Sequence, residues 1–371
     1  MNSRQHKTKA EVEWRMFARP VLSAIKCALV ITFCTFSFTS ACAEERSAAA
    51  AAKATVDGYE VTFPALGTLV EIKVFASDES LVRRTIQTAE ERTKAIETIL
   101  TDYDPDSEAS QLTVRAAAGV SVPVSTDLWK VLEASDRWYR ISGGAFDASL
   151  GSLTHLWRGA RRTGKPLADQ SRVQALERCG WENVKLDSHS QSVQFLREGV
   201  KLDFGAIGKG YVVDEVFTIL QTAGLKQCLV NISGNMRAGD APPDRDGWRI
   251  EIAPLEKGQP PLRRLMLANI SIATSGDLWQ FIMVDGQRRS HILDPRTGES
   301  ARGPIAATVI AASAADADAC ATAVCVLGPS AGAQLVESLS QTEALILEHS
   351  EFDQPVRYVV TSGFAGADLK N

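Results

Sequence analysis

The sequence predicts one α+β domain that begins near Tyr59 and continues to the end of the chain. Short alternating strand patterns are mixed with long amphipathic helix patterns, and no repeat or long Pro/Gly/Ser linker interrupts them. The composition, with 45% apolar and 23% charged residues in 371, excludes disorder, collagen and a coiled coil. A formal net charge of −5 argues against a general nucleic-acid binder, which normally carries a basic surplus.

The first 43 residues are predicted to be a secretory signal outside the fold. Basic residues precede an apolar run, residues 27–38, which is too short for a membrane-spanning helix. The polar segment before this run is long for a signal, so Met16 is an alternative start to Met1. Two cleavage sites compete. Ser-Ala-Cys resembles a lipobox with a lipid on Cys42, although Thr39 stands where leucine is usual, and Ala-Cys-Ala at 41–43 suits ordinary signal peptidase.

The sequence therefore predicts a protein on the periplasmic side of a bacterial membrane, held by a lipid, with a soluble periplasmic protein as the alternative. Residues 44–58, which are rich in alanine, are predicted to be a flexible tether. The exported domain would carry a net charge of −9, because the leader holds six of the 40 basic and two of the 45 acidic residues. Its four cysteines have no metal-type spacing and are expected to be core residues.

The secondary-structure pattern follows the chain in order. Alternation predicts a strand over 68–75, and a helical apolar period over 80–100 ends in a turn-rich loop, 101–108. A second helix is expected over 126–140. Further predicted strands cover 199–204, 227–232, 248–253, 281–285 and 305–312, and further predicted helices cover 209–223, 315–327 and 330–338.

Residues 201–211, Lys-Leu-Asp-Phe-Gly-Ala-Ile-Gly-Lys-Gly-Tyr, join a strand pattern to an amphipathic helix through a glycine-rich turn. Such a turn lets backbone amides approach an anion, and Lys209 adds a positive charge where the helix begins. The spacing does not match a Walker A loop. The segment indicates either a phosphate-binding turn or a plain β-turn-α unit with a packing glycine.

A second candidate site lies on the helix predicted over 315–327. Ser313 and Asp316 form an S-x-x-D capping box at its start. Asp318 and Thr322 are then one turn apart on the same helix face. A carboxylate beside a hydroxyl offers hard oxygen ligands that suit Mg²⁺. The alternative is a solvated Asp318 and a Thr322 packed in the core.

Two further segments carry candidate polar groups. A strand ending at His291 and turning at Asp294 would place an imidazole and a carboxylate at a strand end, and histidine is suited to proton transfer near neutral pH. The alternative is a structural histidine that fixes the turn. In the glycine-rich segment 143–153, Asp147 could accept a hydrogen bond from a ligand or cap the following helix, and the sequence leaves both open.

Six segments occur in order along the exported chain: Tyr103–Glu108, Gly144–Asp147, Asp203–Tyr211, Ala273–Asp277, Ser290–Gly298 and Ala317–Thr322. Together they resemble the FAD:protein FMN transferase family, also called ApbE flavin transferases, from Leu66 to about Gly328. The resemblance implies a single large ApbE-like domain of mixed sheets packed with helices. It also implies an enzyme that binds FAD and Mg²⁺, transfers the FMN moiety to a threonine hydroxyl of an exported redox protein, and releases AMP.

The resemblance also implies roles for individual residues. Asp318, Thr322 and the carbonyl of Ala206 would hold the metal. Residues implied to contact FAD are Ala109, Ser110, Gln111, Asp147, Lys209, His291 and Ile292. The implied partners are exported acceptors with a Ser/Thr-rich motif, such as subunits of membrane redox complexes, and a membrane reached through a lipid on Cys42.

The chemistry of the residues agrees with this role. Phosphoryl-type transfer needs charge neutralisation on the diphosphate and an aligned nucleophile, and Mg²⁺, Lys209 and the turn amides could neutralise that charge. A base must take the proton of the acceptor hydroxyl. His291 is the first candidate for this base, with Asp294 and Asp277 in reserve.

The chain departs from the family's usual pattern at three positions. Asn235 stands where an aspartate is usual, Ser152 where a proline is common, and Gly208 where an alanine precedes the lysine. Asn235 removes a carboxylate that would assist FAD or metal binding. None of the three departures changes the Asp318/Thr322 pair, so they affect the prediction of substrate handling more than that of metal binding. The alternatives are a hydrolase that splits FAD into FMN and AMP with water, an FAD-binding lipoprotein without turnover, and a structural lipoprotein.

Overall fold

The computed structural model describes residues 12–17, 57–116, 118–165, 167–253, 260–277, 281–284, 287–301, 305–348 and 357–364. The predicted apolar run 27–38, Cys42 and residues 44–56 of the predicted tether lie outside the described residues.

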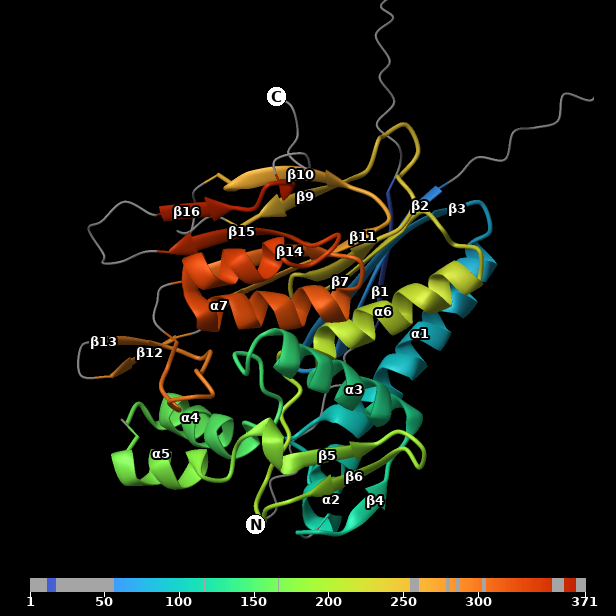
Figure 1. Cartoon of the computed structure of the whole chain (residues 1–371). Helices are drawn as coiled ribbons and strands as arrows, with labels where there is room; N and C mark the ends of the chain where they lie inside the picture. The colour runs from blue at the N-terminus through green and yellow to red at the C-terminus, as the bar shows by residue number, and fades with distance from the viewer. Residues whose placement is uncertain are drawn as a thin grey trace, which may run out of the picture.

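A nine-stranded sheet forms the centre of the fold, and each pair of neighbouring strands in it is antiparallel (Figure 1). In spatial order the strands are β1 (Glu13–Phe17), β2 (Asp57–Ala65), β3 (Thr68–Ala76), β7 (Cys228–Ile232), β8 (Asn235–Ala238), β11 (Ile270–Gly276), β14 (Ile305–Ala311), β15 (Glu343–Glu348) and β16 (Arg357–Val360).

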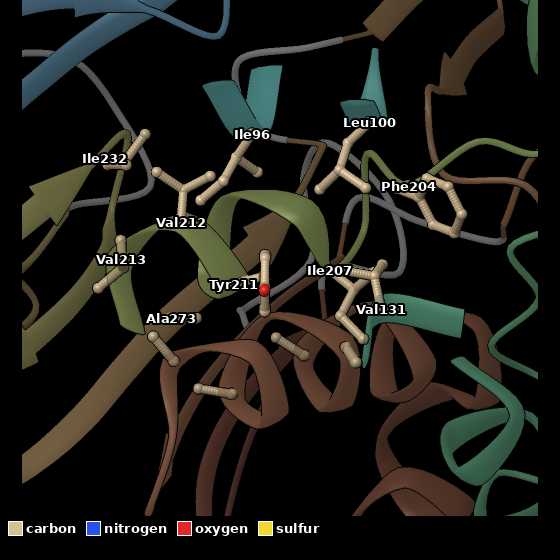
Figure 2. Close-up of a cluster of buried hydrophobic side chains, with 14 of the residues drawn as sticks. Ile96, Leu100, Val131, Phe204, Ile207, Tyr211, Val212, Val213, Ile232 and Ala273 are labelled. Carbon is tan, nitrogen blue, oxygen red and sulfur yellow. The ribbon is translucent and has the colours of Figure 1, made fainter. Parts of the chain in front are cut away.

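The two faces of this sheet are covered differently. Helices α1 (Glu79–Leu100), α6 (Gly208–Thr222) and α7 (Ala314–Glu337) lie on one face, and the hairpin of β9 (Trp248–Ile252) and β10 (Arg263–Leu267) lies on the other (Figure 1). Because strand side chains alternate, Val230 packs with the helices whereas Leu229 packs with the hairpin. Figure 2 shows the helix-side core around Val212 of α6.

A smaller layer completes the domain below the helices in Figure 1. It holds α2 (Glu108–Arg115), α3 (Thr126–Ile141), the 3-10 helix Trp181–Asn183 and a sheet of β4 (Ser121–Pro123), β6 (Ser192–Phe195) and β5 (Val184–Asp187). Beside it lie α4 (Gly151–Thr163), α5 (Asp169–Leu176) and the hairpin of β12 (Phe281–Val284) and β13 (Gln287–Ser290).

The α+β class is confirmed, and most of the predicted elements are present. The two helices predicted on either side of 328–329 are both present within α7. Gly328, with φ 79° and ψ 175°, interrupts the helix between them, and Pro329 follows it, as the Gly-Pro pattern predicts. The strand predicted over 199–204 is wrong. Its side chains are alternately buried, but among the described residues the segment forms one isolated bridge, between Lys201 and Leu150. The alternating apolar pattern therefore arises from burial and not from strand pairing.

Strand β1 lies inside the predicted leader. Glu13–Phe17 pairs with residues 58–62 of β2, so these five residues belong to the sheet in this structure and do not lie outside it as predicted. Without β1, β2 would be the edge strand of the sheet, and the open edge of a sheet readily pairs with an extended segment. The leader and its cleavage stay predictions.

Helix α7 is the one helix in the described ranges that is long and apolar enough to cross a membrane by length and composition. It packs inside the fold against β11, β14 and α6 and contains the buried Asp318. These contacts are typical of a core helix in a globular domain.

Candidate active site

A cleft of about 890 Å³ collects most of the predicted site residues. Its walls come from segments far apart in the sequence: the β2–β3 turn, the end of α1, α4, the turn before α6, the β7–β8 turn, β11, the ends of the β12–β13 hairpin, and α7. The volume falls within the roughly 300–1,000 Å³ usual for small-molecule sites.

The glycine-rich turn forms one wall of this cleft. Asp203 Oδ1 accepts a hydrogen bond from the Gly205 N–H at 2.8 Å, which holds the turn closed. Lys209 Nζ donates to the Gly205 carbonyl oxygen at 2.7 Å, and both residues line the cleft. The N-cap residue of α6 is Ile207, whose own side chain has no oxygen to accept from the helix N–H groups.

Gly210 brings α6 against α7. A Cβ atom at this position would lie 2.3 Å from the Ala314 carbonyl oxygen, so no larger residue fits without moving one helix. The packing-glycine interpretation therefore holds for Gly210, while the turn before it still lines the cleft.

Asp318 lies at this contact between the two helices. Its side chain is buried, so the alternative of a solvated carboxylate is wrong. Oδ2 accepts a hydrogen bond from the Gly210 N–H at 3.2 Å and lies 3.6 Å from Lys209 Nζ. Burial raises the pKa of the Asp318 carboxyl, although the charge of Lys209 and the Gly210 amide oppose this shift. Asp318 thus supplies a negative charge to the start of α6.

Thr322 lies one turn further along α7 and also lines the cleft. Its hydroxyl is 3.1 Å from the Ser275 hydroxyl of β11, so the cleft wall here is polar. Ala206, the third predicted metal ligand, lines the same cleft. The structure therefore brings all three predicted metal ligands to one cavity.

The donor set on this wall fits Mg²⁺. In the part of the chain that the structure describes, no three His, Cys, Asp or Glu side chains converge, so those ranges hold no zinc-type cluster. One carboxylate, one hydroxyl and backbone carbonyls are hard oxygen donors. Mg²⁺ is commonly held by one or two carboxylates and keeps its other positions for water and substrate phosphates.

His291 and Ile292 follow β13 and line the cleft. His291 is exposed, whereas Ile292 is buried. The Ser290 hydroxyl accepts a hydrogen bond from the Ile292 N–H at 3.1 Å, which fixes the backbone directly after His291.

The two reserve bases do not line the cleft. Asp294 accepts hydrogen bonds from the Arg296 guanidinium at 2.7 and 2.8 Å. Burial alone would raise the pKa of Asp294, but the Arg296 hydrogen bonds and charge lower it below its ordinary value. Asp277 is buried and accepts a hydrogen bond from the Ile305 N–H at 3.0 Å, so it holds β11 against β14. Both carboxylates are thus already engaged, Asp277 by a backbone amide of the neighbouring strand and Asp294 by a side chain two residues along the chain.

Asp147 lines the cleft, but its carboxylate oxygens accept hydrogen bonds from other residues of the protein. Oδ1 accepts from the Ser149 N–H at 2.7 Å and hydroxyl at 2.6 Å, and Oδ2 accepts from the Trp181 N–H at 3.1 Å. Burial raises the pKa of Asp147, against these hydrogen bonds. Of the two alternatives left open for Asp147, the helix cap is wrong, because the N-cap residue of α4 is Leu150.

The predicted FAD contacts at 109–111 are not on the cleft wall. They lie in α2, where Ala109 is buried, the Ser110 N–H donates to Ser107, and Gln111 Nε2 donates to the Pro105 carbonyl at 2.7 Å. The loop before α2 reaches the cleft instead, through Asp102 and Tyr103.

Sequence reasoning missed an ionic cluster on the cleft wall. Arg158 of α4 donates to Asp102 and, at 2.7 Å, to Asp203 Oδ2, and its guanidinium lies 4.5 Å from the centre of the Tyr103 ring. Arg158 escaped notice because the pattern did not predict α4. Two of the six motif segments contain Tyr103 and Asp203, and they were the sequence signal from which this cluster could have been found.

Asn235 begins β8 after a tight turn at 233–234, where both residues have positive φ values. Its side chain is buried on the cleft wall, and Nδ2 donates to the Ile232 carbonyl oxygen at 3.3 Å. Within the described ranges, Oδ1 has no hydrogen-bond partner. A carboxylate here would be a second buried negative charge on this wall, which the neutral amide avoids.

Comparison with known proteins supports one assignment. The family model described as the ApbE family matches residues 66–346. The FAD:protein FMN transferase of Treponema pallidum is 30% identical over 312 residues, which cover 80% of this chain and 86% of that protein. The FAD:protein FMN transferase of Haemophilus influenzae is 28% identical over 297 residues, covering 76% of this chain and 84% of that protein.

Solved structures agree with the sequence comparison. The apo flavinyl transferase ApbE of Pseudomonas stutzeri superposes with a TM-score of 0.74 at 27% identity, covering 84% of this chain and 97% of that one. The flavin transferase ApbE of Vibrio cholerae has the same TM-score at 24% identity, covering 84% of this chain and all of that one, and shows the shared fold. With the family match spanning most of its length, the chain belongs to the ApbE family.

Proposed function

We propose that the protein transfers the FMN part of FAD to an acceptor protein. The observation that supports this proposal is one cleft lined by a buried carboxylate and a hydroxyl of α7, with the carboxylate 3.6 Å from Lys209 in the first turn of α6. Relatives that cover most of this chain are FAD:protein FMN transferases, and the sites of such enzymes must neutralise a diphosphate.

The proposed metal is Mg²⁺, held by Asp318, Thr322 and the Ala206 carbonyl. When bound, it would supply positive charge to the diphosphate. Lys209 adds a second positive charge to the cleft, and the Gly205 carbonyl and Asp318 hold its ammonium group in place. The start of α6 adds the partial positive charge of a helix N-terminus.

The proposed acceptor group is a threonine hydroxyl of an exported redox protein. Its oxygen attacks the FMN phosphorus, the phosphoanhydride bond breaks, and AMP leaves with the bonding electron pair. His291, at the exposed side of the cleft, takes the hydroxyl proton. No covalent enzyme intermediate is needed.

The assay for this function uses the purified protein with FAD, Mg²⁺ and an exported acceptor with a Ser/Thr-rich motif. We expect covalent flavin fluorescence on the acceptor and an equal amount of AMP, both lost in EDTA. If neither product forms, the proposed function is wrong. FMN and AMP released without acceptor would identify an FAD hydrolase, and FAD binding without products would identify a binding protein.

Replacing Lys209 with alanine is expected to weaken FAD binding by about tenfold, or ~1.4 kcal/mol, because a partly buried cation is lost from the cleft. Titration of FAD against the protein in EDTA measures this effect without the metal. Lys201→Ala is the matched control, since Lys201 is exposed and lies outside the cleft wall. An unchanged dissociation constant for Lys209→Ala would refute the phosphate role.

The proposed location is the periplasmic side of a bacterial membrane. The support is the basic-apolar-small pattern of residues 1–43, with Cys42 as the proposed lipid attachment site. Mass spectrometry of the mature N-terminus tests this. A diacylated Cys42 at the first position supports the lipid, an unmodified chain beginning at Glu44 shows ordinary cleavage, and an intact leader contradicts export.

A further inference from the structure

Arg158 joins two loops on the cleft wall. It projects from α4 and donates from one guanidinium nitrogen to Asp102, after α1, and from another to Asp203, before α6. Both loops line the cleft, as does Arg158 itself. The Arg158 and Asp203 side chains are 31% and 10% exposed, so water screens this ion pair only partly.

The contacts of Asp203 extend from Arg158 to the proposed metal site. Asp203 Oδ2 accepts from Arg158, and Oδ1 accepts from the Gly205 N–H at 2.8 Å. The Gly205 carbonyl then accepts from Lys209, which lies 3.6 Å from Asp318. One continuous series of polar contacts therefore leads from α4 to the buried carboxylate of α7.

The cluster also controls the charge of the cleft. Two carboxylates share one guanidinium, and the aromatic ring of Tyr103 covers one side of that guanidinium. Arg161, one turn along α4, is a second cation near Tyr103. Without Arg158, two partly buried carboxylates would face an anionic ligand, and like charges in a poorly screened site repel strongly.

We propose that Arg158 is a positioning residue for the FAD site. Arg158 neutralises Asp102 and Asp203, and it holds the glycine turn that presents Lys209 to the diphosphate. This inference rests on the proposed function. Arg158 acts through other residues and needs no contact with FAD, because its guanidinium nitrogens already bind the two carboxylates.

The first test is FAD affinity as a function of pH, measured by titration in EDTA. Arg158→Met is expected to bind FAD about tenfold more weakly than the wild type at pH 8. Burial and the charge of Asp203 raise the pKa of Asp102, and Arg158 opposes that shift, so removing Arg158 raises the pKa further. Asp102 then takes up a proton at a higher pH than in the wild type, so the variant is expected to recover affinity as the pH is lowered.

The matched control is Arg162→Met. Arg162 belongs to the same helix but is exposed and does not line the cleft. It is expected to change FAD affinity by less than about threefold, with no recovery at low pH. Equal losses and equal pH profiles for the two variants would show a general charge effect and overturn the inference.

A charge-rescue variant separates charge neutralisation from folding. Asp102→Asn combined with Arg158→Met removes one negative charge along with the positive one, so it should regain part of the FAD affinity at pH 8 and lose the pH dependence. The affinity that it does not regain measures the lost bridge to the glycine turn. Arg158→Lys keeps the charge but cannot bridge both carboxylates with a planar fork, so intermediate affinity is expected. If thermal unfolding shows that the double variant is folded and its FAD affinity is not restored, the inference is wrong.

The outcomes also separate this inference from the proposed function. Wild-type protein that transfers flavin, together with an Arg158→Met variant that binds FAD normally at pH 8, would overturn only the role of Arg158. Wild-type protein that binds no FAD would overturn both.

Discussion

Replacing Asp318 with asparagine is expected to reduce Mg²⁺-dependent flavin transfer by about a thousandfold or more while the fold is kept. Asparagine still offers an oxygen to the Gly210 N–H but no negative charge to a divalent cation. Transition-state charge stabilisation of this kind is worth several kcal/mol. AMP release and covalent flavin on the acceptor measure transfer, and Mn²⁺ titration followed by electron paramagnetic resonance measures metal binding.

The same variant is expected to keep or gain stability without metal. Burial raises the pKa of Asp318 in the folded protein above its unfolded value. Ionisation therefore costs stability as the pH rises through the unfolded pKa towards the folded one, and asparagine does not ionise. Thermal unfolding in EDTA at pH 4 and pH 7 tests this, and a variant that unfolds or transfers flavin normally would refute the ligand assignment.

Asp316 is the matched control, because it lies two residues before Asp318 on α7. Its carboxylate accepts hydrogen bonds from the Trp138 indole at 2.8 Å and the Ser313 hydroxyl at 2.7 Å, and it pairs with Arg137. Asp316→Ala should lose about 1–2 kcal/mol of stability through the broken helix start, yet retain Mg²⁺-dependent transfer.

Replacing His291 with alanine is expected to slow transfer to the acceptor by about 10²–10⁴, the usual contribution of a general base. FAD affinity should change by less than about threefold, because the role proposed for the exposed His291 is proton transfer from the acceptor and not binding of the diphosphate. Single-turnover transfer from enzyme preloaded with FAD separates the chemical step from binding. A wild-type transfer rate in this variant would remove His291 from the mechanism.

Asp294→Asn is the control for the choice of base. Asp294 lies three residues after His291, is bound to Arg296 and is not on the cleft wall, so its loss should change the transfer rate by less than about threefold. A severe loss here, with His291→Ala unaffected, would assign the base to Asp294 instead.

Patterns that depend on one element were predictable from the sequence. The Ser313 hydroxyl accepts from the Asp316 N–H at 3.1 Å, as the capping box predicts. The same helix geometry places Asp318 and Thr322 on one face, and both line the cleft. The family also followed from the sequence, since six short segments in order carry information that no single segment has.

Only the tertiary structure decided which polar groups meet and which are already engaged. Asp277 looks like Asp318 in the sequence, but the fold directs it to the backbone amide of Ile305 on the neighbouring strand. Gly210 permits the close approach of α6 and α7 that buries Asp318 beside Lys209. Local spacing specifies the face of a helix, whereas burial, charge pairing and access to a cleft depend on contacts between segments far apart in the sequence, which no local pattern records.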